Sequence, residues 1–373
     1  MRRFTRAIVP AVALVLAACG GSGKGRSPSR RPAPDAAETV GRRWRWVAPP
    51  PSYVGMPAAD SEEVVVTYGH SHVVLLDAGG RPRWTVDHRS VRDVAARLTP
   101  DAVLVPTEEG LVALDRATGA TRWQAGIGDR ANTPVVAGGR AVVSTWDGSL
   151  VALDLAGGRV AWRVPLPGVA LGPAAGDDRT VVTTWEAEHG AGAGALAVDA
   201  ATGRQRWAVP FPEGGVSGPG LLAAADGERL VVLLAGDIAA HALALDSGTE
   251  RWSTPLEGAG SPEVVPLDAG GGAVLVGHRL GGLVLLDGAD GRVRWEASSD
   301  GAAVRGGPTG PGPGGAYALP LEDGRLLLAG PAHRARVLDP PGRVSGVASG
   351  PGGALLVATR ETTENDLTAL SGW

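Results

Sequence analysis

The chain has 373 residues and a formal net charge of −4, with 35 basic and 39 acidic side chains. Residues 1–45 carry ten of the basic and two of the acidic side chains, which leaves residues 46–373 with a net charge of −12. This acidic body argues against nucleic acid as a partner, because phosphate backbones require a cationic surface. The single cysteine, Cys19, excludes a disulfide framework within the chain.

Residues 1–18 have the pattern of a secretory signal peptide. Three arginines among the first six residues precede an apolar stretch, residues 7–18, which is too short to span a membrane as a helix. The stretch ends in the sequence LAAC at Cys19 and resembles the lipobox of bacterial lipoproteins. The resemblance implies that lipid is attached to the Cys19 thiol and that the chain is cleaved before it. An ordinary signal peptide followed by a chance cysteine is the alternative.

Residues 19–39 are rich in Gly, Ser, Pro and Arg, a composition typical of a flexible tether. The tether is basic, so its side chains could lie against anionic lipid headgroups. The segment GGSGKG superficially resembles a phosphate-binding loop, but no Ser or Thr follows Lys24 and no strand precedes the segment. We therefore predict a signal peptide over 1–18, a tether over 19–39 and a folded domain over 40–373. The protein would be exported, on the outer side of the cytoplasmic membrane or in the outer membrane.

The strongest feature of the sequence is a repeat that occurs six times. Each copy has an alternating apolar run, an Asp, a short turn that ends in Gly, three further residues and a Trp. The Asp can bond backbone N–H groups and start a turn, the Gly can supply a positive φ, and the Trp offers a large packing surface. The copies carry Asp77 and Trp84, Asp115 and Trp123, Asp154 and Trp162, Asp199 and Trp207, Asp246 and Trp252, and Asp287 and Trp295.

Each repeat has room for four strands. In one of them we expect strands at 133–137, 140–145, 150–154 and 159–164. A four-stranded antiparallel unit of about 40 residues is the size of a β-propeller blade. The sequence therefore predicts an all-β propeller in which the repeats follow one another around a ring.

The two ends of the folded domain predict how the ring closes. We expect a degenerate seventh unit at 334–339 followed by Gly342, and an eighth that begins at Val344 and ends one strand short. Residues 40–47 form a lone strand that can complete the last blade and remove two exposed sheet edges. From Trp46 to the C-terminus there are 328 residues, or 41 for each of eight blades. Seven blades are the alternative.

This repeat resembles that of pyrroloquinoline-quinone (PQQ) type propellers. One group with such repeats, the quinoprotein dehydrogenases, binds PQQ and calcium on the propeller axis. The other is the BamB family of outer-membrane barrel-assembly factors, which are short, lipid-anchored and eight-bladed. This chain is similar to the second group, because it lacks the length and the vicinal cysteines of the first. The resemblance implies an envelope scaffold or assembly factor with no catalytic residues and no cofactor.

Two other functions stay open from the residues alone. A quinoprotein-like enzyme would place convergent polar groups on the propeller axis, and a small-ligand sensor would have a deep axial pocket without catalytic groups. Among the seven histidines, His70 and His72 could share a metal on one side of a strand. The alternative, which we favour, is two solvated histidines in a turn, because no third ligand lies nearby in the sequence. We predict no metal site.

We predict a partner-binding face. In a propeller, the turns between second and third strands lie on the same face as the connections between blades. Aromatic side chains beside charged groups on such a rim are typical of recognition surfaces. A basic partner is one option, and the alternative is that the loops are merely polar and the aromatics pack between blades. The candidate residues are Tyr68, Trp146, Trp185, Glu108, Glu109, Asp147 and Glu186, and Glu322 and Asp323 are expected on the same face.

Overall fold

The structure is a computed structural model in which the chain divides into two compact units, Met1–Glu38 and Thr39–Trp373. It describes residues 40–50, 52–187, 192–211, 215–217, 219–223, 227–235, 239–256, 267–268, 272–277, 282–298, 312, 315–331, 333–340, 342–360 and 365–373. The predicted signal peptide, Cys19 and tether lie outside these residues. Within the described ranges, no helix has the length and apolar character needed to cross a membrane.

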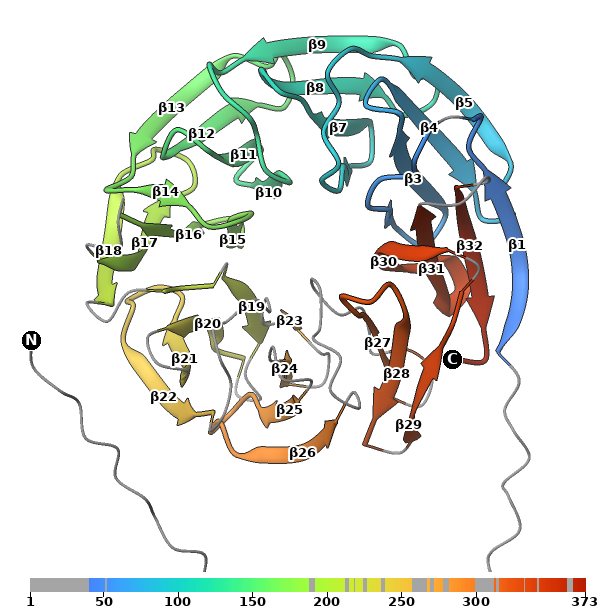
Figure 1. The fold of residues 1–373 in the computed structure, drawn as a ribbon. Coiled ribbons are helices and arrows are strands. Elements are labelled where there is room, and N and C mark those ends of the chain that lie inside the picture. Colours follow the sequence, from blue (N-terminus) through green and yellow to red (C-terminus); the bar gives the residue numbers. More distant parts are fainter. Residues whose placement is uncertain are drawn as a thin grey trace, which may run out of the picture. The chain divides into compact units, whose positions relative to one another are not determined.

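The second unit is built from eight small antiparallel sheets, the blades, which follow one another around a ring (Figure 1). We number the strands of each blade from the innermost, the first, to the outermost, the fourth. Blade 1 contains β2 (Ala58–Ala59), β3 (Glu63–Tyr68), β4 (His72–Asp77) and β5 (Pro82–Asp87). Blade 2 contains β6 (Arg97–Leu98), β7 (Ala102–Pro106), β8 (Gly110–Asp115) and β9 (Thr121–Gly126). Blade 3 contains β10 (Val135–Ala137), β11 (Arg140–Thr145), β12 (Ser149–Asp154) and β13 (Val160–Pro165).

The next blades repeat this order. In blade 4, β14 (Val169–Ala170) and β15 (Ala175–Gly176) both pair with β16 (Thr180–Glu186), which is followed by β17 (Ala193–Asp199) and β18 (Gln205–Phe211). Blade 5 contains β19 (Gly220–Ala223), β20 (Arg229–Ala235), β21 (Ala239–Ala244) and β22 (Glu250–Pro255). Blade 6 contains β23 (Leu267–Asp268), β24 (Ala273–Gly277), β25 (Gly282–Asp287) and β26 (Val293–Ser298).

Blades 7 and 8 include the degenerate units. In blade 7 the described strands are β27 (Tyr317–Pro320), β28 (Leu326–Gly330) and β29 (His333–Leu338). Blade 8 contains β30 (Arg343–Gly350), β31 (Ala354–Arg360), β32 (Asp366–Ser371) and β1 (Gly41–Val47), with the 3-10 turn η3 (Pro351–Gly353) between β30 and β31. The prediction of eight blades is confirmed.

The first strand of the folded domain closes the ring, as predicted. In Figure 1, β1 lies outside β32, and the two strands pair antiparallel from Gly41↔Ser371 to Val47↔Asp366. Arg45 forms an ion pair with Asp366, whose side chain is buried. Segments from opposite ends of the domain thus form one blade, and β1 covers the edge that β32 would otherwise expose.

The sequence pattern, in which Asp339 and Gly342 stand for the turn after a third strand, predicted residues 334–339 as the third strand of the seventh unit. This assignment was wrong, because these residues form the fourth strand. The inner strand β30 begins beside the turn between β27 and β28, because Val344 N–H donates to Gly324 O over 2.9 Å. Ser345 at the same end of β30 bonds Val54 in a connection between blades. The β27–β28 turn therefore lies on the face of the connections, which makes β29 the fourth strand rather than the third. Glu322 and Asp323 are accordingly on the predicted face.

Five of the six repeat tryptophans, and Trp44 of β1, join their blade to the next one. The indole Nε1 donates to a backbone oxygen in the turn between the third and fourth strands of the following blade, over 2.8–3.1 Å. The ring also lies on the glycine of that turn. The six donor–acceptor pairs are Trp44–Ala78, Trp84–Arg116, Trp123–Leu155, Trp162–Ala200, Trp207–Leu245 and Trp252–Gly288.

The Asp of the repeat organises the same turn from within its own blade. In five copies one carboxylate oxygen accepts backbone N–H groups two to four residues on, as Asp77 does from Gly79 and Arg81. Asp246 differs: its Oδ1 lies 3.4 Å from Thr180 Oγ1 and 3.9 Å from Arg206, both in the preceding blade. The recurring Asp, Gly and Trp therefore form a structural unit.

Candidate functional site

We call the face that carries the second-to-third-strand turns and the blade connections the connection face. The two kinds of segment are bonded to each other: His88 N–H and Val91 N–H, in the connection after blade 1, donate to Ser71 O and His70 O in its turn. All seven residues of the predicted partner-binding face lie on or next to such turns. Their exposure divides them into two groups.

The prediction that Tyr68 lies on the partner-binding surface was wrong. Its side chain is only 6% exposed and belongs to the core between blades 8 and 1. Its ring stacks on His72 with centroids 4.5 Å apart, and Trp46 contacts its edge at 5.4 Å. The connection into blade 1 covers it, since Val54 forms a bridge with Tyr68. This burial removes Tyr68 from any surface that a partner could contact.

Trp185 and Glu186 are half-buried. The Trp185 indole packs against the core between blades 3 and 4 together with Trp162 and Val164. A Cβ atom added at Gly194 would come within 2.9 Å of the indole, so this glycine makes room for it. Trp185 therefore serves mainly as an inter-blade packing residue, which was the alternative for the aromatics.

Trp146 is the exposed aromatic of the set, with 48% of its surface accessible. Two guanidinium groups stack on its ring, Arg92 at 5.1 Å and Arg130 at 5.3 Å from the ring centroid. Its Nε1 donates to Asn132 Oδ1 over 3.3 Å. Cation–π contacts and the hydrogen bond together hold an exposed indole in one orientation.

Glu108 pairs with both arginines. Its carboxylate lies 2.7 Å from Arg130 Nε and 3.6 Å from Arg92 Nε. Arg92 also donates to Ala131 O over 2.6 Å. Burial lowers the pKa of the Arg92 guanidinium from its ordinary value, and the nearby Glu108 carboxylate opposes this effect. A nearly buried cation that carries this many bonds is a fixed support for the Trp146 ring.

A second set of hydrogen bonds fixes the other side of this surface. Asn132 Nδ2 donates to Ser144 Oγ over 3.1 Å and to Gly172 O over 3.2 Å. Ser144 Oγ donates to the same Gly172 O over 2.6 Å. Residues from the connection into blade 3, from blade 3 itself and from the connection into blade 4 are thereby joined. We call Arg92, Glu108, Arg130, Asn132 and Trp146 the Trp146 platform.

Glu109 and Asp147 flank the platform. Asp147 accepts a bond from Thr145 Oγ1 over 2.5 Å and lies 3.7 Å from Arg163. Glu109 lines a depression of about 540 Å³ together with Asp87, His88, Arg89, Ser90, Thr107 and Gln124. The depression lies next to the platform, because Glu108 N–H donates to Ser90 O over 2.9 Å.

His70 and His72 do not converge. His70 Nδ1 lies 3.7 Å from Asp93, whereas His72 Nε2 lies 3.0 Å from Asp87 and its ring stacks on Tyr68. Among the residues that the structure describes, no three His, Cys, Asp or Glu side chains form a group that could hold a metal ion. The two histidines instead link the turn of blade 1 to the connections beside it.

Sequence reasoning did not single out Arg92, Arg130 or Asn132. They lie in connections between blades, which carry no repeat, and they reach Trp146 from residues 14 to 54 positions away. The two arginines do not hold equivalent positions in their connections, because the bridges Val91–Thr107 and Ala131–Thr145 match Arg92 with Asn132. No repeated pattern in the sequence therefore marks them.

These features define the class of the protein, an eight-bladed β-propeller with an exposed, rigid aromatic on its connection face. The profile of the family described as "Outer membrane protein assembly factor BamB" matches residues 36–133, 69–168, 107–262, 147–310 and 239–331. These matches cover well over half of the sequence, so the chain belongs to this family. No curated protein has a sequence that matches it significantly.

Solved structures share the fold at low sequence identity. BamB from Moraxella catarrhalis superposes with a TM-score of 0.66 and 16% identity, over 89% of this chain and 99% of that chain. The computationally designed Ika8 protein gives a TM-score of 0.68 at 14% identity, over 84% and 96% of the two chains. The C-terminal WD40 domain of Sif2 gives 0.67 at 11% identity, over 88% and 98%. At these identities the likeness concerns the fold alone.

Proposed function

We propose that this protein is an exported, lipid-anchored propeller of the cell envelope that binds another envelope protein as a scaffold or assembly factor. Residues 1–18 would be removed as a signal peptide, the Cys19 thiol would carry the lipid, and residues 19–39 would tether the propeller. The family's description as an assembly factor supports a binding role over a catalytic one. The proposal requires no cofactor.

The Trp146 platform is the observation that carries the binding role. Large exposed aromatics supply much of the energy at protein interfaces, particularly where polar groups surround them. Trp146 is already held by Arg92, Arg130 and Asn132, so a partner would lose little free energy in ordering its side chain. None of these contacts closes the exposed surface of the indole. The platform therefore offers a preorganised contact for another protein.

The test is a chemical cross-linking pull-down from intact envelopes, with the wild type, Trp146→Ala, Cys19→Ala and Val160→Ala. Val160 is the matched control, because it is 49% exposed but lies on the outer strand β13 of blade 3. We expect one envelope protein to be captured by the wild type and by Val160→Ala, and to be lost with Trp146→Ala.

The Cys19→Ala variant separates anchoring from binding. We expect it to be released into the soluble fraction and to lose the partner in cells, yet to bind the same partner when both are mixed in detergent. Full capture by Trp146→Ala would remove the platform from the proposal. Retention of Cys19→Ala in the membrane would contradict the lipid anchor.

A further inference from the structure

A groove of about 900 Å³ lies on the opposite face, between blades 1 and 2. This hairpin face carries the turns between first and second strands and between third and fourth strands. The floor of the groove contains Glu63 and Arg116, and its walls contain Glu62, Arg83, Asp101, Asp115 and Arg122. No residue of the Trp146 platform borders this groove, so a ligand of the groove would not compete with the proposed protein partner.

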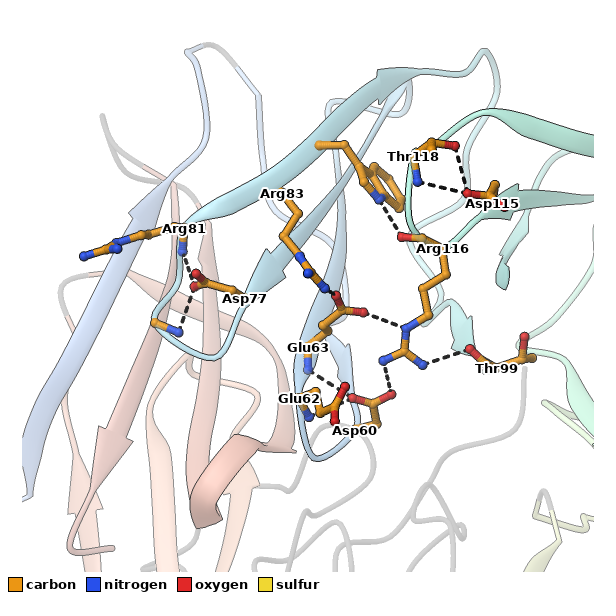
Figure 2. Close-up of polar contacts among 12 residues, drawn as sticks. Asp60, Glu62, Glu63, Asp77, Arg81, Arg83, Thr99, Asp115, Arg116 and Thr118 are labelled. Atoms are coloured by element: carbon orange, nitrogen blue, oxygen red, sulfur yellow. Dashed lines mark hydrogen bonds and ion pairs between the residues drawn. The ribbon is translucent and has the colours of Figure 1, made fainter. Parts of the chain in front are cut away.

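The floor is a network of ion pairs around the buried carboxylate of Glu63 (Figure 2). Glu63 is 2% exposed; its Oε2 lies 2.6 Å from Arg116 Nε, and its Oε1 pairs with Arg83. Arg116 also pairs with Asp60 Oδ2 at 2.5 Å and donates to Thr99 O over 2.8 Å. The Trp84 indole bonds the Arg116 carbonyl. Each of the three guanidinium nitrogens of Arg116 thus donates a hydrogen bond, which fixes its side chain in the floor.

The other blades provide an internal comparison. Glu63 pairs across the sheet with the repeat residue Asp77, and the equivalent positions hold Ala102, Arg140, Thr180 and Ala273. Arg116 follows the repeat residue Asp115, where the other copies have Ala78, Leu155, Ala200, Ser247 and Gly288. A buried carboxylate opposite another carboxylate is an expensive arrangement, and the blade fold forms without it elsewhere. Its single occurrence at this groove favours a role in binding.

The walls carry hydrogen-bonding groups of both kinds. Arg83 is 57% exposed and pairs with Glu63 through Nη1, while Arg122 donates through Nη1 to Asp101 O over 2.9 Å. Their other N–H groups border the groove together with the exposed carboxylates of Glu62 and Asp101. The apolar lining is limited to Pro100 and Ala117. An apolar ligand would find little surface to contact here.

The charges of the groove further limit the chemical class of ligand that it can bind. The groove and Asp60 contribute five carboxylates and three guanidinium groups, which disfavours phosphates and other polyanions. The three guanidinium groups among these carboxylates also make the groove a poor site for a polycation. A hydroxyl group both donates and accepts, so a chain of hydroxyl groups matches alternating guanidinium and carboxylate groups. The volume falls within the range of small-molecule sites.

We propose that the groove between blades 1 and 2 binds a neutral oligosaccharide. Glu62 and Asp101 would accept from sugar hydroxyls, and Arg83 and Arg122 would donate to them. The Glu63–Arg116 floor would hold both walls in place, so its part is positioning rather than contact. A propeller at the cell envelope would thereby have a protein-binding face and a separate saccharide-binding face.

The test measures binding of maltotetraose, cellotetraose and chitotetraose to the full chain in detergent, by saturation-transfer NMR and calorimetry. The variants are Glu62→Gln and Arg122→Gln, which change the walls and leave the floor intact. Arg251→Gln is the matched control, because Arg251 also precedes a repeat Trp but pairs with Glu228 on blade 5. Urea unfolding of each variant checks that the propeller is intact.

We expect one tetrasaccharide to bind, and its affinity to fall by about tenfold or more in each wall variant, since each change removes a charged hydrogen bond. Arg251→Gln and Trp146→Ala should bind as the wild type does. Absence of binding by all three sugars, or equal binding by the wall variants, would overturn the proposal. Because Trp146→Ala tests the partner surface, either proposal can fail while the other stands.

Discussion

The indole of Trp123 in blade 2 lies directly on Gly158 of blade 3: a Cβ atom built at Gly158 would come within 2.5 Å of the ring. The backbone of Gly158 has a φ of +68°. Two separate requirements, a left-handed backbone and an empty space for the neighbouring indole, therefore act on one residue. The same relationship joins Trp44 to Gly80 across the closure of the ring.

Gly158→Ala tests this relationship. We expect it to lower the free energy of unfolding by about 2–4 kcal/mol, since it adds overpacking against the indole to the penalty of a positive φ. The control is Gly139→Ala, which has a φ of +73° and no atom within 4 Å of the added Cβ. The control should lose only about 1 kcal/mol. Equal losses in urea unfolding would show that the indole contact contributes nothing.

The two environments of tryptophan predict different effects of truncation. Trp123→Ala should destabilise the propeller by about 3–5 kcal/mol, because it opens a cavity between blades and leaves Leu155 O without its donor. Trp146→Ala should change the free energy of unfolding by about 1 kcal/mol or less, since the side chain is half exposed and its ring contacts are with arginines. A large loss for Trp146→Ala in urea unfolding would give Trp146 a structural role.

The closing strand depends on one buried ion pair. Arg45→Ala leaves the Asp366 carboxylate buried, with Thr359 Oγ1 as a hydrogen-bond donor at 2.9 Å. We expect a loss of about 2–3 kcal/mol in the free energy of unfolding, at the lower end for a buried pair because Arg45 is partly exposed. In a double-mutant cycle, we compare the loss of unfolding free energy in the double variant Arg45→Ala/Asp366→Asn with the sum of the losses in the two single variants. The loss in the double variant should be smaller than that sum by at least about 1 kcal/mol. Additive losses would mean that the pair is not coupled.

Acid should weaken the turns of the repeat. Hydrogen bonds from Arg206 and Thr202 hold the pKa of Asp199 below its ordinary value of 3.8, and a backbone bond from Ala289 does the same for Asp287. Because the pKa is lower in the folded state, these carboxylates stabilise the fold above pH 3.8, and the contribution disappears as the pH falls through the folded-state pKa.

Asp199→Asn removes one such contribution. At pH 7 it should be less stable than the wild type by under about 1 kcal/mol, since the carboxylate is largely exposed and solvent screens it. The difference should shrink as the pH is lowered below 3.8, because the wild type then loses the same interaction. Urea unfolding between pH 7 and pH 2 measures this, and a difference that stays constant would argue against the shift.

The repeat made the fold predictable from sequence. In every copy its Asp, Gly and Trp lie within a stretch of nine residues or fewer, so their spacing can be read directly from the sequence. Closure of the ring could be predicted because the N-terminal end of the domain has one strand too many and the C-terminal end has one strand too few. The seventh unit was misread because Arg336 stands opposite Leu328, in the register position where other blades have Trp, and because Asp339 and Gly342 imitate the turn of the repeat.

The candidate site was predictable only in part, since its contacts cross between blades. The face and the exposed Trp146 could be placed from the turn alone. The burial of Tyr68 depends on Trp46 from the opposite end of the domain, and the platform depends on arginines from two connections. Such contacts depend on the tilt of neighbouring blades, which no local pattern encodes.

The pairing of β1 with β32 has a consequence for the order of events during synthesis. Arg45 and Asp366 are 321 positions apart, so the first strand of the propeller has no partner until nearly the whole chain has been made. Contacts of such long range form late. The ring therefore cannot close before β32 has been synthesised, whatever the order in which the other blades form.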